Sequence, residues 1–342
     1  MHQFYAPKLE PQFREQYQVV ASSSYDIEAR RVATKFSETN IRRCLYRPMD
    51  VRWLYYEPNL TSRPAEKVMK HMLEGSNLGL ISTRQTQEKW DVLATKGLCG
   101  HKSCAAYDIN SLFPLYLYEH SLSFDLGRTG ASTTQSFTKR PNLNAGFLSA
   151  LAATLEVQQK GAHGLPAGLT PEDIFHYAYA VFHSPGYRNR YAEFLKIDFP
   201  RLPLTGTLAL FRALGRLGGE LTALHLLESP KLAHPLTAFI GGRSPAVERA
   251  SWSRDTVWVD KAQTTGFQGV REDVWNFHIG GYQVCVKWLK DRKSRTLSQD
   301  DIAHYQKIVV ALSETIRLMA EIDRVIDEHG GWPAAFQTTA SA

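Results

Sequence analysis

The sequence predicts an α+β protein with a mixed-sheet region, a helical part and a long C-terminal helix. Segments in which apolar and polar residues alternate, as in strands, concentrate in residues 44–120 and recur in residues 250–280. Apolar residues at helical spacing dominate residues 147–230 and 281–328. With 342 residues, 43% of them hydrophobic and 22% charged, the chain has a globular composition and enough length for one large or two small cores.

The chain is expected to divide into three parts. Residues 1–43 carry scattered apolar positions without clear periodicity, so they predict no core of their own and look like the tail of another domain. Residues 44–333 hold the strand and helix signals and are expected to form the main domain. Residues 334–342 predict a disordered tail.

Strand and helix signals alternate in the first sheet-rich part. The alternation over residues 51–55 predicts a strand. Ser62 and Pro64 favour the start of a helix, and Gly75 stands where a left-handed cap would end it. Three further apolar segments predict strands, over residues 78–83, 90–95 and 113–118.

The middle of the chain changes from loop to helix. Residues 121–145 are rich in Ser, Thr, Gly, Asn and Arg and show little hydrophobic periodicity, so they predict a long loop that a partner could order. Thr170, Pro171 and Asp173 supply a capping hydroxyl, a first-turn proline and a third-position acid for a helix that ends near residue 183. Two more helices are expected, over residues 187–195 and from residue 208 to the Gly218-Gly219 pair.

The last part returns to strands and then ends in a helix. Alternating apolar residues near 257–259 and at 275–279 predict strands. Ser298 and Asp301 have the spacing of a capping box, and apolar residues then recur at steps of three and four. We therefore expect one long helix over residues 299–328 that packs against the sheet or another domain.

Composition limits the setting and the partners. The chain has 40 Lys and Arg against 34 Asp and Glu, a formal net charge of +6, which favours a polyanionic partner without requiring one. No apolar run approaches the roughly 18 residues of a membrane span, and the N-terminal residues lack the apolar segment of a signal peptide. Four cysteines are too few for a disulfide framework, so a cytoplasmic location is expected.

Several chemistries lack their motifs in this sequence. There is no glycine-rich phosphate-binding loop, no Pro-Pro pair of the kind that amino methyltransferases of DNA use, and no metalloprotease His-Glu pair. The one Asp-x-Lys match, Asp291 to Lys293, lies in a charged helix end, which favours no nuclease site. The spacing of Cys99 and Cys104 is unusual for zinc, so a turn with two free thiols is the better interpretation. No catalytic residue and no metal ligand is predicted.

Three clusters of basic and amide-bearing residues are the candidate contacts to a nucleic acid. The first, Arg84 and Gln85, directly follows an expected strand, and these side-chain types pair bidentately with guanine and adenine edges in the major groove. The other two are a turn and a helix start suited to phosphate or base contacts: Lys96, His101, Lys102 and Ser103, and then Arg188, Asn189 and Arg190. Each cluster alone is more often a solvated surface, but together, on a basic chain without catalytic motifs, they favour DNA binding.

Several segments, in order and spacing, resemble the target-recognition region of type ISP restriction-modification enzymes and their single-chain type II relatives. The resemblance runs from about residue 40 to about residue 333. Its last part is similar to the type ISP C-terminal specificity domain in particular. The segments that carry it are Tyr46 to Tyr56, Gly79 to Gln85, Phe113 to Tyr118, Phe175 to Pro185, Tyr187 to Tyr191, Trp275 to Tyr282 and Trp288 to Arg292.

The resemblance implies a part of a larger bacterial system. Full-length members join a nuclease, a helicase-like translocase, an adenine-N6 methyltransferase and a specificity domain that recognises an asymmetric duplex site. It implies that residues 1–43 are the end of a methyltransferase-like domain. The expected partners are double-stranded DNA and an adenine-N6 methyltransferase domain or subunit. No cofactor is expected in this chain, because S-adenosylmethionine, ATP and Mg would serve only the other domains.

The resemblance also implies that the chain is no enzyme by itself and instead directs DNA methylation and restriction carried out elsewhere. Two alternatives stay open at this point. One is a structural, subunit-bridging module in which the helix over residues 299–328 docks a partner and the basic clusters are merely solvated. The other is a stand-alone nuclease.

Overall fold

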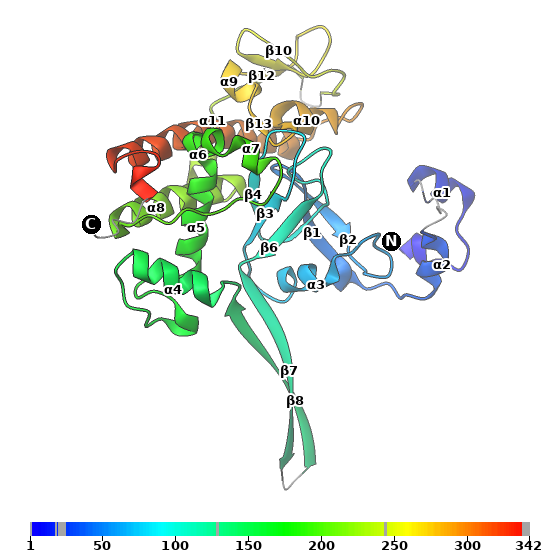
Figure 1. The fold of residues 1–342 in the computed structure, drawn as a ribbon. Helices are drawn as coiled ribbons and strands as arrows, with labels where there is room; N and C mark the ends of the chain where they lie inside the picture. The colour runs from blue at the N-terminus through cyan, green and yellow to red at the C-terminus, as the bar shows by residue number, and fades with distance from the viewer. Residues whose placement is uncertain (1, 18, 20–24, 128–129, 243–244, 337–342) are drawn as a thin grey trace.

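Small sheets lie against a layer of helices, and the two share one continuous apolar core (Figure 1). The computed structural model describes residues 2–17, 19, 25–127, 130–242 and 245–336. The arrangement confirms the predicted α+β class with a long C-terminal helix. Of the expected tail over residues 334–342, the structure describes Ala334–Phe336 as a short 3-10 turn, and the remainder lies outside the described residues. No helix in the described ranges is long and apolar enough to cross a membrane.

The N-terminal segment forms an appendage at one side of the molecule (Figure 1). It has a small apolar cluster that includes Phe4, Leu9 and Leu60 and is separate from the main core. The buried guanidinium of Arg31 donates a hydrogen bond of 3.1 Å to the Phe4 carbonyl oxygen and so ties the first residues to the helix that follows. The helical pieces are η1 (His2–Tyr5), α1 (Pro11–Tyr17), α2 (Ile27–Val32) and η2 (Glu38–Asn40).

Two three-stranded sheets, in the orders β2-β1-β5 and β4-β3-β6, form the first half of the main domain. The predicted strands over 51–55, 78–83 and 90–95 correspond to β2, β3 and β4. Most residues of β3 and all of β4 are buried in the core, whereas Val51 and Trp53 of β2 are exposed. The helix expected near Pro64 is short and divided. The elements are β1 (Ile41–Arg47), β2 (Asp50–Tyr55), α3 (Glu66–Met69), η3 (Lys70–Met72), β3 (Gly79–Thr83), β4 (Val92–Thr95), β5 (Leu98–Cys99) and β6 (Asn110–Pro114).

A two-stranded ribbon replaces the loop expected over residues 121–145, so that prediction is wrong. Strands β7 (Tyr116–Gly127) and β8 (Gly130–Pro141) pair antiparallel along their whole length and project away from the rest of the molecule (Figure 1). Serine- and threonine-rich sequence is typical of loops, yet threonine is compatible with extended backbone, and Gly127 pairs with Gly130 at the end of the ribbon. The expected strand over 113–118 is divided between β6 and β7.

Helices form the layer beside the sheets. The capping box predicted at Thr170 and Asp173 is confirmed, with the Asp173 backbone N–H donating to the Thr170 hydroxyl oxygen at 3.1 Å. The single helix expected over 187–195 is divided at Tyr191. The helices are α4 (Ala145–Thr154), α5 (Pro171–His183), α6 (Pro185–Arg190), α7 (Ala192–Leu195) and α8 (Leu208–His225).

Helix α8 continues past the Gly218-Gly219 pair to His225, so the predicted stop is wrong. Within the pair, Gly218 is required by packing and not by helix termination. A Cβ at Gly218 would overlap the carbonyl oxygen of His176 in α5, so the missing side chain lets the two helix backbones approach closely.

The C-terminal part adds two small sheets and the longest helix. Helix α11 is capped by Ser298 and Asp301 as predicted, and its apolar stripe is buried in the main core. The strand expected over 275–279 is wrong over its first half, because Trp275 closes a helical turn that begins at Glu272. The elements are β9 (Ala238–Ile240), β10 (Ser251–Ser253), β11 (Thr256–Trp258), β12 (Gly266–Gln268), α9 (Glu272–Trp275), β13 (His278–Ile279), β14 (Tyr282–Gln283), α10 (Val284–Lys290) and α11 (Gln299–Glu328).

Candidate nucleic-acid interface

Two loops meet at the end of the β4-β3-β6 sheet where β3 finishes. Residues 84–89 leave β3 directly, and residues 100–109 lead into β6, whose first residue Asn110 pairs with Thr83 at the end of β3. Antiparallel pairing therefore brings the first predicted cluster and the end of the second to one edge of the sheet. We call residues 84–89 and 100–109 together the loop platform.

Hydrogen bonds between its two loops make the platform one unit. The Gln87 backbone N–H donates to Asp108 Oδ2 at 3.0 Å, and the Ala106 backbone N–H donates to Glu88 Oε2 at 2.8 Å. The Ser103 backbone N–H donates to Asn110 Oδ1 at 2.7 Å. Acidic and amide side chains thus fix the loop backbones, which leaves the exposed side chains of the platform free for other contacts.

The hairpin of β13 and β14 inserts beneath the platform. At its tip the Gly280 backbone N–H donates to Asp91 Oδ2 at 3.2 Å, and the Tyr282 hydroxyl donates to the Lys102 carbonyl oxygen at 2.9 Å. Gly280 has a φ of +54°, and a Cβ there would overlap the carbonyl oxygen of Cys104. A residue without a side chain is therefore required for this close approach.

Helices α6 and α7 bring the third cluster beside the first. The Thr86 backbone N–H donates to the Lys196 carbonyl oxygen at 3.0 Å, which joins the platform to the end of α7. A groove of about 570 Å³ runs between them and is lined by Lys89, Asn189 and Lys196, among others. Arg84, 72% exposed, lies beside it and faces Asp198 at 3.5 Å. Gln85, Asn189 and Arg190 are also exposed.

Two of the predicted contact residues have structural partners instead. Arg188 donates hydrogen bonds of 2.6 and 3.1 Å to the two carboxylate oxygens of buried Asp91 and a third of 2.7 Å to the Phe182 carbonyl oxygen. These contacts hold α6 against β4. Ser103 is fully buried, and its hydroxyl donates to the Leu45 carbonyl oxygen at 2.7 Å. The side chains of Arg188 and Ser103 therefore make hydrogen bonds within the chain and are not free donors for DNA.

The second cluster is divided between two places. Lys96 follows the opposite end of β4 from the platform and pairs with Glu228 at 2.5 Å. Lys102 is exposed on the platform, and a ring nitrogen of half-buried His101 contacts the Arg63 carbonyl oxygen at 3.1 Å. Of the predicted contact residues, Arg84, Gln85 and Lys102 are exposed on the platform, and Asn189 and Arg190 are exposed at the end of α6 instead of at a helix start. Lys96 lies apart from them.

The structure adds two groups that the sequence reasoning did not select. Tyr107 and Ile109 are large side chains on the platform that are 72% and 56% exposed. Their exposure is visible only in the fold, because the sequence around them resembles an ordinary strand start.

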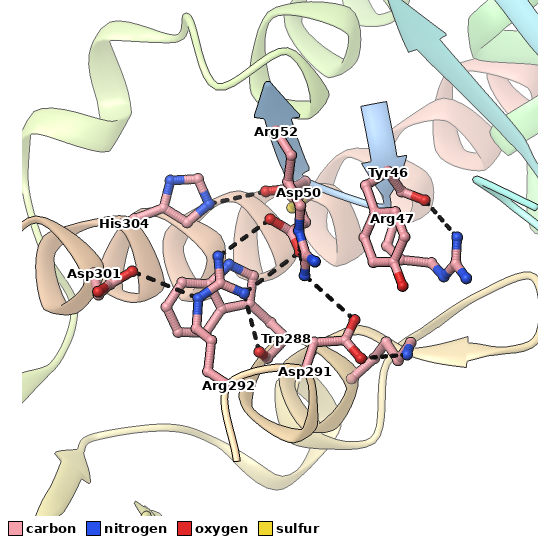
Figure 2. A network of polar contacts seen from close by, with 11 residues as sticks. Tyr46, Arg47, Asp50, Arg52, Trp288, Asp291, Arg292, Asp301 and His304 are labelled. Carbon is pink, nitrogen blue, oxygen red and sulfur yellow. Dashed lines mark hydrogen bonds and ion pairs between the residues drawn. The ribbon is translucent and has the colours of Figure 1, made fainter. Parts of the chain in front are cut away.

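The second added group is a polar network that joins the β1–β2 hairpin to α10 and α11 (Figure 2). Asp50 is buried and pairs with Arg52 at 2.7 Å and with Arg292 at 3.2 Å. Burial alone would raise the pKa of Asp50, but the hydrogen bonds from Arg52 and Arg292 outweigh it and hold that pKa below its usual value.

The same network accounts for the Asp291 segment. Its carboxylate pairs with Lys287 at 2.6 Å and lies 3.6 Å from the Arg52 guanidinium. The single Asp-x-Lys match is therefore part of an ion-pair network between α10 and β2. No group of three or more His, Cys, Asp or Glu side chains in the described part of the chain is placed to hold a metal ion.

The four cysteines are free and buried. Burial raises the pKa of Cys44 to about 11 and that of Cys99 and Cys285 to about 12, so the thiols are protonated at neutral pH. The turn with two free thiols expected at Cys99 and Cys104 agrees with this arrangement.

The fold and the platform define a class of protein: an α+β module that presents basic and amide-bearing loops at one edge of a small sheet. The chain belongs to the family described as the type ISP C-terminal specificity domain, whose family model matches residues 8–321. No curated protein sequence matches the chain.

Solved structures with the same fold come from larger DNA-bound proteins. The ATP-dependent type ISP restriction-modification enzyme LlaBIII bound to DNA has 16% identity and a TM-score of 0.66 over 94% of this chain and 21% of that chain. A nuclease-deletion mutant of the type ISP enzyme LlaGI in complex with a DNA substrate mimic has 17% identity and a TM-score of 0.59, over 86% of this chain and 22% of that chain. The DrdV–DNA complex has 20% identity and a TM-score of 0.61, over 86% of this chain and 29% of that chain. The chain thus spans less than a third of the length of each, and at these identities the likeness establishes the fold.

Proposed function

We propose that this chain is the sequence-specific double-stranded DNA recognition module of a type ISP restriction-modification system. It would direct adenine-N6 methylation and restriction that other domains or subunits carry out. The observation that supports this most is the exposed Arg84–Gln85 pair on the loop platform, beside a groove whose other wall carries Asn189 and Lys196. The similar solved structures are complexes with DNA or a DNA substrate mimic, which supports DNA as the partner in this proposal.

Base recognition falls to three exposed side chains. Arg84 would donate two hydrogen bonds to a guanine edge, and Gln85 and Asn189 would each pair with an adenine edge in the major groove. The ion pair of Arg84 with Asp198, at 3.5 Å, has both side chains exposed. Such pairs contribute little to stability, so Arg84 can exchange Asp198 for a base at small cost.

The exposed cations around the same surface would fix the register of the protein on the duplex. Lys89, Lys102, Arg190 and Lys196 are exposed and lie on or beside the platform. Contacts from such side chains to phosphates fix the position of a protein on DNA without recognising sequence. A methyltransferase domain or subunit would hold the other side of the duplex and receive the flipped adenine. S-adenosylmethionine, ATP and Mg would act there.

The structural-bridge alternative depended on a partner for the long helix. In the structure the apolar stripe of α11 is buried against the helices and sheets of this same chain. That stripe is therefore already covered, and the observation favours the recognition module.

A variant experiment tests the assignment of Arg84 and Gln85. We would select a duplex from a random library with the full chain, together with a methyltransferase portion, and then measure affinity for all single-base variants of that duplex. Arg84→Ala is expected to lose discrimination at one guanine position by about 1–3 kcal/mol, and Gln85→Ala at one adenine position by a similar amount. The matched control is Arg212→Ala, at an exposed position on α8. Unchanged base preferences in both platform variants would contradict the assignment.

A further inference from the structure

The network between the β1–β2 hairpin and α10 brings together four cations and three carboxylates. Asp50, Asp291 and Asp301 supply the negative charges. Arg52 and Lys287 face Asp50 and Asp291 at 2.7 and 2.6 Å, and Arg292 faces Asp301 at 3.5 Å. Arg47 is the fourth cation of the group, and the structure records no ion pair between it and any carboxylate that it describes. Figure 2 shows the Arg47 guanidinium extending away from the carboxylates of the network.

Aromatic rings hold the Arg47 guanidinium in place. It lies 4.1 Å from the centroid of the Tyr46 ring and 5.2 Å from that of Tyr282. Arg52 lies 3.9 Å from the same Tyr46 ring. Arg47 donates a hydrogen bond from Nη1 to the Tyr46 carbonyl oxygen at 2.7 Å. The buried Nε–H of Arg47 has no acceptor among the described residues. Arg47 is thus a fixed, half-buried cation with unused donors.

This guanidinium adjoins the loop platform. Tyr282, which borders it, donates its hydroxyl to the carbonyl oxygens of Lys102 and Ala105 at 2.9 and 3.1 Å. Leu45, two residues before Arg47, accepts hydrogen bonds from Gly100 and Ser103 of the platform. Arg47 therefore lies next to the loop platform.

We infer that Arg47, held between Tyr46 and Tyr282, binds a phosphate of the DNA backbone. A planar guanidinium fixed by stacking offers paired Nη–H donors that match a phosphate, and a phosphate would supply the missing negative charge. The buried Nε–H takes no part in this contact. The inference rests on the proposed function and adds a sequence-independent contact to it. Arg47 sets register, whereas Arg84 and Gln85 discriminate bases.

The test compares Arg47→Ala and Arg47→Lys in the full chain, in the presence of the methyltransferase portion, over a range of salt concentrations. Arg47→Ala is expected to weaken binding of the selected duplex and of a scrambled duplex by the same factor. It should also reduce the slope of log K against log salt by about 0.9, the value for one lost phosphate contact. Arg47→Lys keeps the charge, so it should retain the salt slope while losing part of the affinity. Arg212→Ala is the matched control.

The outcomes separate this inference from the function on which it rests. If Arg84→Ala changes base preference while Arg47→Ala leaves affinity and salt slope at wild-type values, the phosphate contact is wrong and the recognition function stands. If Arg47→Ala changes the preferred base, Arg47 contacts a base edge and the inference is equally wrong. If the wild-type chain binds no duplex, the proposed function fails first.

A calorimetric titration with inorganic phosphate distinguishes DNA from a free anion. Weak or undetectable binding of phosphate ions, together with loss of duplex affinity in Arg47→Ala, supports the backbone contact. Binding of phosphate ions that Arg47→Ala abolishes, with duplex affinity unchanged, would assign the site to a free anion and overturn the inference.

Discussion

At the scale of single residues, the core holds two neighbouring histidines whose rings lie 5.1 Å apart. Nδ1 of His225 contacts the Tyr179 hydroxyl at 2.5 Å, and its Nε2 contacts the Thr315 hydroxyl at 3.0 Å. Burial lowers the pKa of His225 to about 4 and that of His183 well below its usual value. Both rings are therefore neutral at pH 7, and His225 joins α8 to α5 and α11 through neutral hydrogen bonds.

This pair predicts that the folded chain loses stability as the pH falls from about 6.5 towards 4. In that window the unfolded chain binds a proton at His225 that the folded chain does not, so acid favours unfolding, by about 3 kcal/mol at most from this residue. Urea unfolding at several pH values measures the effect. His225→Gln should flatten the dependence, and the exposed loop variant His163→Gln should not. Equal pH dependence in wild type and His225→Gln would refute the account.

A second residue-scale prediction concerns the two arginines of α6. Removing Arg188 leaves the buried Asp91 carboxylate without its cation, so Arg188→Met should cost about 3–5 kcal/mol in the free energy of unfolding. Its exposed neighbour gives the matched control, because Arg190→Met should change stability by less than about 0.5 kcal/mol. Denaturant unfolding of both variants decides the matter. Equal stability would mean that the Asp91–Arg188 pair does not hold α6 in place.

At the scale of elements, two of the three glycines of α8, Gly215 and Gly218, face different surroundings. A Cβ at Gly215 would lie 3.7 Å from the Asp173 carbonyl oxygen, an ordinary contact, whereas at Gly218 it would overlap the His176 backbone. Gly215→Ala is therefore expected to stabilise the chain by up to about 1 kcal/mol through helix propensity. Gly218→Ala should destabilise it by more than that, because α5 and α8 must separate. Thermal unfolding measures both, and the same sign for the two variants would contradict the packing account.

The elements that sequence could predict are those whose signals are local. The capping boxes at Thr170 and Ser298 and the apolar runs of β3 and β4 need only neighbouring residues, and all appear in the structure. The Gly218-Gly219 pair was misjudged because its role depends on α5, which packs across it. The β7–β8 ribbon was missed because its strands carry polar residues typical of loops.

The candidate site divides in the same way. Arg84 and Gln85 could be selected because they follow a predictable strand, and Asn189 because it lies beside an arginine-rich helix start. Arg188 could not be distinguished from its neighbours by sequence, since its partner Asp91 lies 97 positions away. Arg47 was missed for a related reason. Its lack of a carboxylate partner becomes visible only once Arg292 is seen to pair with Asp50 across 242 positions.

At the scale of the whole molecule, the formal net charge of +6 can now be related to a particular surface. Exposed Lys and Arg side chains gather on and beside the loop platform: Arg84, Lys89, Lys102, Arg190 and Lys196. Arg84 and Lys196 are in exposed ion pairs, with Asp198 at 3.5 Å and Glu193 at 2.6 Å. A surface of this kind attracts a polyanion and is screened by salt.

The charge distribution predicts a moderate salt dependence of DNA binding. If three to five of these cations contact phosphates, the slope of log K against log salt should be about −3 to −5. A fluorescence titration over a range of salt concentrations measures the slope. A slope near zero would mean that the exposed cations do not contact the DNA backbone.

Sequence-specific recognition is the central claim, and one competition measurement tests it most directly. The chain, alone and with the methyltransferase portion, is titrated with the selected duplex and with a scrambled duplex of the same length at physiological salt. The account predicts a preference for the selected duplex of at least about 1,000-fold in the reconstituted protein, reduced in Arg84→Ala. Equal affinity for the two duplexes, with or without the methyltransferase portion, would contradict it.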